Sequence, residues 1–217
     1  MIIVAGVLSQ AEVAATRAAV AKLKFADGRA TAGRIAKQVK VNDQAVASPE
    51  RDAILEKAKK VILAHPVFAA TRPRAMTPLI LSRYRVGQTY GLHVDDALMQ
   101  GLRTDLSFTL FLSDPATYVG GALEVEDTYA PRQVKLAAGD LILYPSTTLH
   151  RVTPVESGER LAIVGWVECW IRGAAERDIL FDLDQALATI EASEGKSAVY
   201  DKIAKSRSNL LRLWAGD

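Results

Sequence analysis

The middle of the chain, from Leu79 to Trp170, consists of short apolar or alternating runs separated by Gly, Pro, Asp or Ser. These runs are "LILSRYRV", "LSFTLFL", "ALEVE", "QVKL", "DLILYP" and "RLAIVGWVECW". Short runs of this kind, bounded by turn residues, are typical of β-strands, and a series of them indicates a sandwich or a barrel. We therefore expect a β core over about residues 79–170.

Helices are predicted before this core. Ser9 and Glu12 form a capping box, in which the serine oxygen accepts from the amide of Glu12 and the glutamate side chain reaches back to the amide of Ser9. A helix is therefore predicted to start there and to fade toward Asp27. A second helix begins after Ser48, a good N-cap followed by proline. It is expected to end near His65, because the next residue is proline. The apolar segment at the N-terminus, "MIIVAGVLSQ", is predicted to contain a strand.

A helical pattern returns at about residue 174 and continues toward the C-terminus. Four apolar residues of its first part fall on one helical face: Ile179, Leu183, Leu187 and Ile190. Gly195 separates this part from a second helix. We expect one domain over residues 1–173 and a helical extension over residues 174–217 that packs on it, because an apolar stripe needs a surface to cover. The same face could also pair two chains into a homo-oligomer.

Composition excludes several classes of protein. The chain has 217 residues, 49% of them hydrophobic, and its 27 basic residues nearly cancel 25 acidic ones. No run of like charge predicts binding to nucleic acid or to a membrane surface. The single cysteine, Cys169, cannot form a disulfide framework or a cysteine-rich metal site and is expected to be buried. No apolar stretch reaches the roughly 18 residues that span a membrane, so we expect a cytoplasmic protein.

Two histidines and one aspartate have the pattern of a metal site. His93 and Asp95 are two residues apart, and on an extended chain such residues project to the same face. On the same argument the adjacent Asp96 points away. His150 follows the predicted strand "DLILYP". Two imidazoles and one carboxylate form the facial triad of oxygen-activating ferrous iron, which leaves adjacent coordination positions open.

Arg160 follows His150 by ten residues and begins a predicted core strand. A buried guanidinium binds a carboxylate through two parallel hydrogen bonds, so Arg160 is the candidate anchor for a dicarboxylic co-substrate. Tyr84 could add a hydroxyl to that carboxylate, although a core tyrosine is an equally good interpretation. The third histidine, His65, lies at a helix end and is not expected to bind metal.

The segments "RYRVGQTYGLHVD", "RTDLSFTLFLSDPATYVGGALEVED" and "AAGDLILYPSTTLHRVTPVESGER" resemble the bacterial PKHD-type hydroxylases, small relatives of the prolyl and lysyl hydroxylases. The resemblance covers nearly the whole chain. It implies a double-stranded β-helix core of the jelly-roll (cupin-like) type, and Fe(II), 2-oxoglutarate and dioxygen as reactants, often with ascorbate as reductant. It also implies that His93, Asp95 and His150 are the metal ligands and that Arg160 binds 2-oxoglutarate.

Other functions fit parts of this pattern. A non-catalytic iron-binding or iron-sensing jelly-roll protein would use the same three ligands, and the association of the family with iron uptake keeps this alternative open. A zinc hydrolase lacks its H-E-x-x-H helix here. A cupin-type isomerase would have no need of Arg160. The substrate is left open between a peptide and a small molecule linked to iron uptake.

Overall fold

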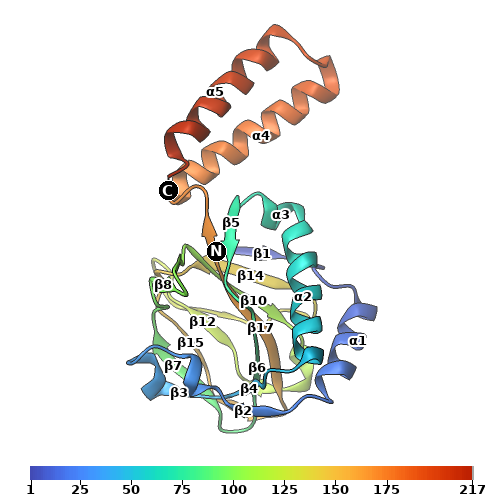
Figure 1. Ribbon diagram of the computed structural model, residues 1–217, viewed down its shortest axis with the longest axis vertical. Coiled ribbons are helices and arrows are strands. Elements are labelled where there is room, and N and C mark those ends of the chain that lie inside the picture. Colours follow the sequence, from blue (N-terminus) through green and yellow to red (C-terminus); the bar gives the residue numbers. More distant parts are fainter. Residues whose placement is uncertain (217) are drawn as a thin grey trace. The chain divides into compact units, whose positions relative to one another are not determined.

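The computed structural model describes residues 1–216 and divides the chain into two compact units (Figure 1). The first unit comprises Met1–His65 and Ala75–Glu168, and the second comprises Pro66–Arg74 and the C-terminal segment from Cys169. Asp217, the last residue of the predicted extension, lies outside the described residues. All the candidate site residues belong to the first unit.

The first unit contains two main antiparallel sheets. The larger sheet has the strand order β1 (Ile2–Val4), β14 (Leu141–Pro145), β10 (Leu106–Phe111), β17 (Arg160–Cys169), β6 (Ile80–Tyr84), β4 (Asp43–Ala45) and β2 (Phe25–Asp27), and β5 (Pro73–Met76) also pairs with β17. The smaller sheet has the order β13 (Arg132–Val134), β12 (Leu123–Val125), β15 (His150–Val152), β7 (Thr89–His93) and β3 (Lys40–Val41). The predicted strands of the middle of the chain are confirmed.

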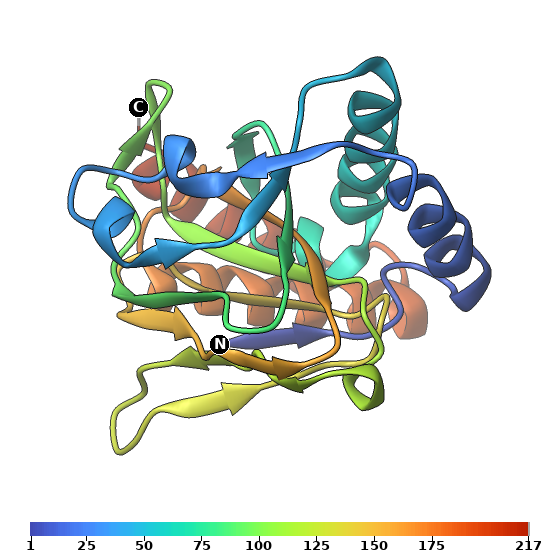
Figure 2. The same cartoon turned by 90° about the horizontal axis from the view of Figure 1, so that it is seen from below.

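Side chains from both sheets meet in one apolar cluster. The larger sheet contributes Tyr84, Phe111, Ile142 and Tyr144, and the smaller sheet contributes Leu123, Val125, Val134 and Val152. This cluster is the core between the two layers, which Figure 2 shows from below. Two further strand pairs, β11 (Val119–Gly120) with β16 (Val155–Ser157) and β8 (Leu98–Met99) with β9 (Leu102–Arg103), complete the strands.

Two helices lie side by side at one flank of the strands (Figures 1 and 2). Helix α1 (Gln10–Val20) carries the predicted capping box, with both hydrogen bonds of the box present. Helix α2 (Pro49–Ala64) begins after the predicted N-cap and ends before His65, as expected. The first helix is shorter than predicted, because the chain leaves it at Val20 and enters β2. Single turns of 3-10 helix occur at Gly28–Thr31, Ala36–Val39 and Pro115–Thr117.

The second unit is helical, with α3 (Pro66–Ala69) and an antiparallel hairpin of α4 (Ala174–Glu194) and α5 (Ala198–Trp214) (Figure 1). Asp184 of α4 accepts hydrogen bonds from Arg207 and, at 2.5 Å, from Arg72. The predicted apolar stripe is wrong at one position, because Leu180 is buried whereas Ile179 is 46% exposed. Two adjacent apolar residues fit a 3.6-residue period almost equally well. No helix within residues 1–216 is both long and apolar enough to cross a membrane.

Candidate active site

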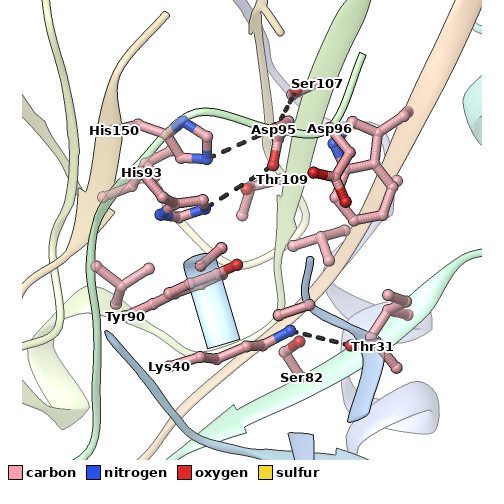
Figure 3. A pocket seen from close by; sticks show the side chains of 18 of the residues that line it. Thr31, Lys40, Ser82, Tyr90, His93, Asp95, Asp96, Ser107, Thr109 and His150 are labelled. Carbon is pink, nitrogen blue, oxygen red and sulfur yellow. Dashed lines mark hydrogen bonds and ion pairs between the residues drawn. The ribbon is translucent and has the colours of Figure 1, made fainter. Parts of the chain in front are cut away.

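Three side chains from two segments of the chain converge at one point of the pocket between the sheets (Figure 3). His93 ends β7, His150 begins β15, and the register of these neighbouring strands pairs the two residues directly. Asp95 follows the end of β7. Its carboxylate oxygens lie 3.8 Å from His93 Nε2 and 3.7 Å from His150 Nε2. The three candidate ligand atoms lie within 4.8 Å of one another, a spacing that could hold one metal ion.

Both imidazoles are oriented by the backbone. The Nδ1 atom of His93 is 2.8 Å from the Gly91 carbonyl oxygen, and that of His150 is 3.0 Å from the Thr148 carbonyl oxygen. A carbonyl oxygen only accepts, so each Nδ1 carries the proton and each Nε2 keeps its lone pair. Burial and then the neighbouring His150 lower the pKa of His93 to about 4. His93 is therefore neutral at pH 7, the form in which imidazole binds metals.

Asp95 is fixed by hydroxyl groups of the larger sheet. Ser107 Oγ donates to Asp95 Oδ2 at 2.5 Å and is itself 2.8 Å from Ser146 Oγ. Only 6% of the Asp95 side chain is exposed, whereas Asp96 is exposed to solvent. The structure thus brings Asp95, and not Asp96, to the histidines, although β7 ends at His93 and both aspartates follow the strand.

Arg160 lies in the same pocket, at the start of β17, where it is paired with Tyr84 of β6. The residue is only 1% exposed. Its guanidinium lies 5.2 Å from the centre of the Tyr84 ring and 5.4 Å from that of Phe111, and its Nε has no hydrogen-bond partner in the described part of the chain. A buried guanidinium without a carboxylate is costly unless an anion binds to it. The site therefore provides a place for a carboxylate ligand.

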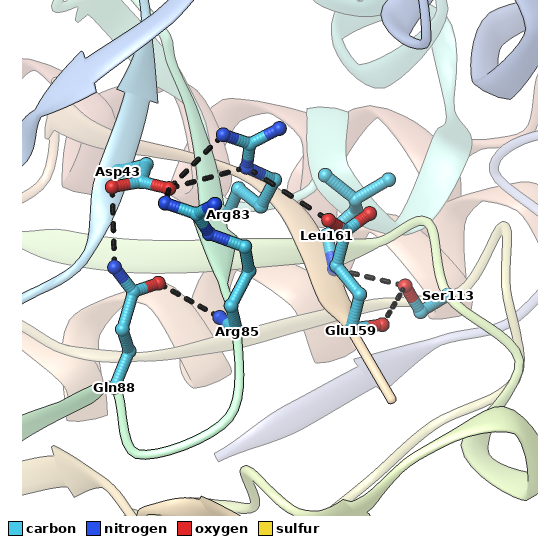
Figure 4. Close-up of polar contacts among 7 residues, drawn as sticks. All are labelled: Asp43, Arg83, Arg85, Gln88, Ser113, Glu159 and Leu161. Atoms are coloured by element: carbon cyan, nitrogen blue, oxygen red, sulfur yellow. Dashed lines mark hydrogen bonds and ion pairs between the residues drawn. The ribbon is translucent and has the colours of Figure 1, made fainter. Parts of the chain in front are cut away.

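The backbone around Arg160 is held on both sides by one hydroxyl. Ser113 Oγ donates to the Glu159 carbonyl oxygen at 2.9 Å and accepts from the Leu161 amide at 2.8 Å (Figure 4). The nearby Arg83 is engaged elsewhere, because its guanidinium donates to Asp43 at 3.0 Å. Arg160 lines the pocket, and no ion pair of its guanidinium occurs within residues 1–216.

The comparisons with known proteins agree with this geometry. Residues 79–168 match the model of the 2OG-Fe(II) oxygenase superfamily, and residues 175–216 match that of the PKHD-type hydroxylase C-terminal domain. A PKHD-type hydroxylase of Parvibaculum lavamentivorans is 47% identical over 99% of this chain and 98% of its own length. The chain belongs to the PKHD-type hydroxylases. Another member, from Maricaulis maris, is 46% identical over 89% of each chain.

Solved structures show the fold of this PKHD-type hydroxylase. A prolyl-4-hydroxylase of Pseudomonas putida aligns with a TM-score of 0.56 and 20% identity, covering 77% of this chain and 91% of that one. A prolyl hydroxylase of Trichoplax adhaerens aligns with a TM-score of 0.55 and 15% identity, covering 76% and 82%. The predicted jelly-roll core and the predicted class of enzyme, a 2-oxoglutarate- and iron(II)-dependent oxygenase, are confirmed.

Sequence reasoning missed several residues of the site in this PKHD-type hydroxylase. Lys40 and Tyr90 line the pocket, and Ser107 positions Asp95. The Tyr90 ring stacks on His93, with centroids 3.6 Å apart and planes at 16°. Tyr90 had no signal, because on a regular strand a residue three positions before His93 points to the opposite face, whereas here the pairing of β7 with β15 shifts register between the two. Lys40 had none, since it lies on a strand of two residues in a polar part of the chain.

The lowered pKa of His93 predicts acid sensitivity of the metal-free protein. The ordinary pKa is 6.5 and the folded pKa about 4, so between these values the unfolded chain binds more protons than the folded one. Stability therefore falls as the pH drops through this window. From pH 7.5 to pH 5, urea unfolding should show a loss of roughly 2 kcal/mol from this residue. The free energy of unfolding of His93→Gln should fall correspondingly less over the same pH range. Equal losses in the two proteins would contradict the lowered pKa of His93.

Proposed function

We propose that this protein hydroxylates a C–H bond of its substrate with His93, Asp95 and His150 binding Fe(II) and Arg160 binding 2-oxoglutarate. The observation that supports this best is the presence, in one pocket, of a two-histidine, one-carboxylate cluster and a buried guanidinium that has no acidic partner among residues 1–216. The donor set fits ferrous iron, since it leaves adjacent positions open for a bidentate acid and for dioxygen.

The residues have separate tasks in this proposal. Iron and 2-oxoglutarate together supply the activation of dioxygen, one oxygen atom entering the substrate as hydroxyl and the other entering succinate, with release of CO2. Arg160 holds the distal carboxylate of 2-oxoglutarate through its planar fork. Burial raises the pKa of Tyr84 to about 12, so its phenol stays protonated and can donate to the same carboxylate. The surrounding apolar side chains exclude water from the reaction.

We further propose that the substrate is a peptide group or a small molecule connected with iron uptake, and that ascorbate keeps the iron reduced. Extract from iron-starved cells is the natural source in which to look for it. Incubation of that extract with protein, ferrous iron and 2-oxoglutarate should yield, by mass spectrometry, a species that gains one oxygen atom and is absent when 2-oxoglutarate is omitted.

The proposal is tested without knowing the substrate. Many oxygen-activating sites of this type turn over slowly when uncoupled, so purified protein should convert 2-oxoglutarate to succinate with ferrous iron, and faster when ascorbate is added. Zinc should not replace iron, because it cannot change oxidation state. Tight iron binding without succinate under any condition, including with the extract, would instead favour the iron-binding or iron-sensing alternative.

A further inference from the structure

A second buried cation faces the pocket. Lys40 is the first residue of β3 and is only 5% exposed. Its Nζ donates to Thr31 Oγ1 at 3.0 Å and lies 5.0 Å from the centre of the Tyr90 ring (Figure 3). In the described part of the chain, no carboxylate oxygen lies within 4.0 Å of this ammonium, the limit for an ion pair. An ammonium has three protons to donate, and the protein satisfies only part of this capacity.

Lys40 is separate from both parts of the proposed site. The Tyr90 ring stacks on His93, and Figure 3 shows the lysine on the other side of this ring. Arg160 comes from the opposite sheet. Around the ammonium the pocket is lined by polar groups, among them Gln44 and Ser82. The lysine thus forms a polar corner of the pocket, and the Tyr90 ring lies between it and the metal cluster.

The charges of the loaded site leave Lys40 uncompensated. Ferrous iron, the Asp95 carboxylate, the 2-oxoglutarate dianion and the Arg160 guanidinium together sum to no net charge. Asp96 also lines the pocket, but it is exposed to solvent and forms no ion pair with the lysine. Asp27 is paired with Arg29. A buried cation in such a place is stabilised when a ligand brings a negative charge.

The titration behaviour of the lysine agrees with this picture. Burial lowers the pKa of Lys40 to about 8, while Asp95 and Asp27 raise it. The amine is therefore still mostly protonated at pH 7.

We infer that Lys40 binds an anionic group of the molecule that is hydroxylated, so that the substrate carries a carboxylate or a group of equivalent charge. The inference rests on the proposed function, because it names a property of the substrate of that same site. Lysine binds as a point charge on a flexible stem, whereas the planar fork of Arg160 suits the fixed position of 2-oxoglutarate. Arg160 would then bind the co-substrate, and Lys40 would bind the substrate.

The test uses two probes of nearly equal size and shape, the anionic N-trifluoroacetylglycine and its neutral amide. Their binding is followed by ¹⁹F NMR on protein loaded with zinc, which is redox-inert, and with saturating 2-oxoglutarate. We expect wild-type protein to prefer the acid. Lys40→Met should bind the acid about ten-fold more weakly, the order of one charge-assisted hydrogen bond, with unchanged binding of the amide. Lys40→Arg should retain the preference.

Matched variants separate charge recognition from damage to the fold. Lys37→Met removes an exposed lysine three residues earlier and should behave as wild type. Thr31→Val removes the hydroxyl that holds Nζ and should weaken binding of the acid by a smaller factor. Anaerobic titration of 2-oxoglutarate should be unaffected by Lys40→Met.

Three results would overturn the inference: no preference for the acid in wild type, equal acid binding in wild type and Lys40→Met, or loss of 2-oxoglutarate affinity in Lys40→Met, which would assign the lysine to the co-substrate. Failure of the proposed function would look different. It would appear as missing iron-dependent succinate formation, an assay that does not involve the probes.

Discussion

Replacement of His93 by alanine is expected to abolish iron-dependent formation of succinate. His93 is 8% exposed, its Nδ1 is fixed by the Gly91 carbonyl, and its Nε2 faces Asp95 and His150. The remaining two donors cannot hold Fe(II) in the facial arrangement that leaves adjacent positions free. Because loss of a mere supporting group of a metal ligand commonly costs 10–100-fold in metal affinity, we expect about 100-fold or more here. Anaerobic titration with ferrous iron measures this change.

Two matched variants make this result specific. His65→Ala also removes one of the three histidines, but His65 caps the end of α2 and is not part of the cluster. Iron affinity and succinate formation should both persist in it. Asp95→Ala should lose iron as His93→Ala does, whereas Asp96→Ala should keep it, because the neighbouring carboxylate points away from the histidines. Iron affinity that falls equally in the two aspartate variants would contradict the assigned cluster.

Local patterns in the sequence were sufficient to predict much of the fold. The caps of α1 and α2 depend on residues within one turn: Ser9 and Glu12 exchange hydrogen bonds, and Ser48 accepts from the Arg51 amide while Pro49 occupies the first helical position. The long strands β10, β14 and β17 contain six, five and ten residues and are almost entirely buried, so their apolar runs stand out. These elements were therefore predictable from residues that are neighbours in the sequence.

Short strands and the register of pairing were not predictable in this way. Strands β3, β8 and β9 have two residues each, too few for an alternating pattern to appear. The direct pairing of His93 with His150 depends on residues that are far apart in the sequence, so it follows from the tertiary fold alone. The i, i+2 spacing of His93 and Asp95 indicated a shared face, and only the pairing of β7 with β15 adds the third side chain at the right place.

Lys40 illustrates the limit most clearly. The segment around it contains Lys37, Gln38 and Asn42, and a lysine in such surroundings is normally solvent-exposed. Its burial results from β3 pairing with the edge of β7 while β4 joins the other sheet. Lys40 lies on this edge strand, and Asn42, the residue between β3 and β4, carries the chain from one sheet to the other. No property of the residues themselves reports this crossing.

Replacement of Arg160 by leucine is expected to weaken 2-oxoglutarate binding while leaving iron binding nearly unchanged. Breaking a buried, hydrogen-bonded charge pair costs on the order of 2 to 5 kcal/mol. At roughly 1.4 kcal/mol per factor of ten, the affinity should fall about 30-fold or more. Lysine at this position should rescue binding only in part, because it carries the charge without the planar two-donor fork.

The decisive measurement is a pair of anaerobic titrations on Arg160→Leu, one with ferrous iron and one with 2-oxoglutarate. Arg83→Leu is the matched control, because Arg83 lies on the adjacent strand but is paired with Asp43, so its loss should leave 2-oxoglutarate affinity unchanged. Unchanged 2-oxoglutarate affinity in Arg160→Leu would mean that another residue binds the distal carboxylate. Arg151 is the other candidate, although it already pairs with Glu124 at 2.7 Å. Loss of both affinities would mean that the buried guanidinium supports the fold and not the co-substrate, since a side chain that contacts only 2-oxoglutarate cannot alter the binding of iron in its absence.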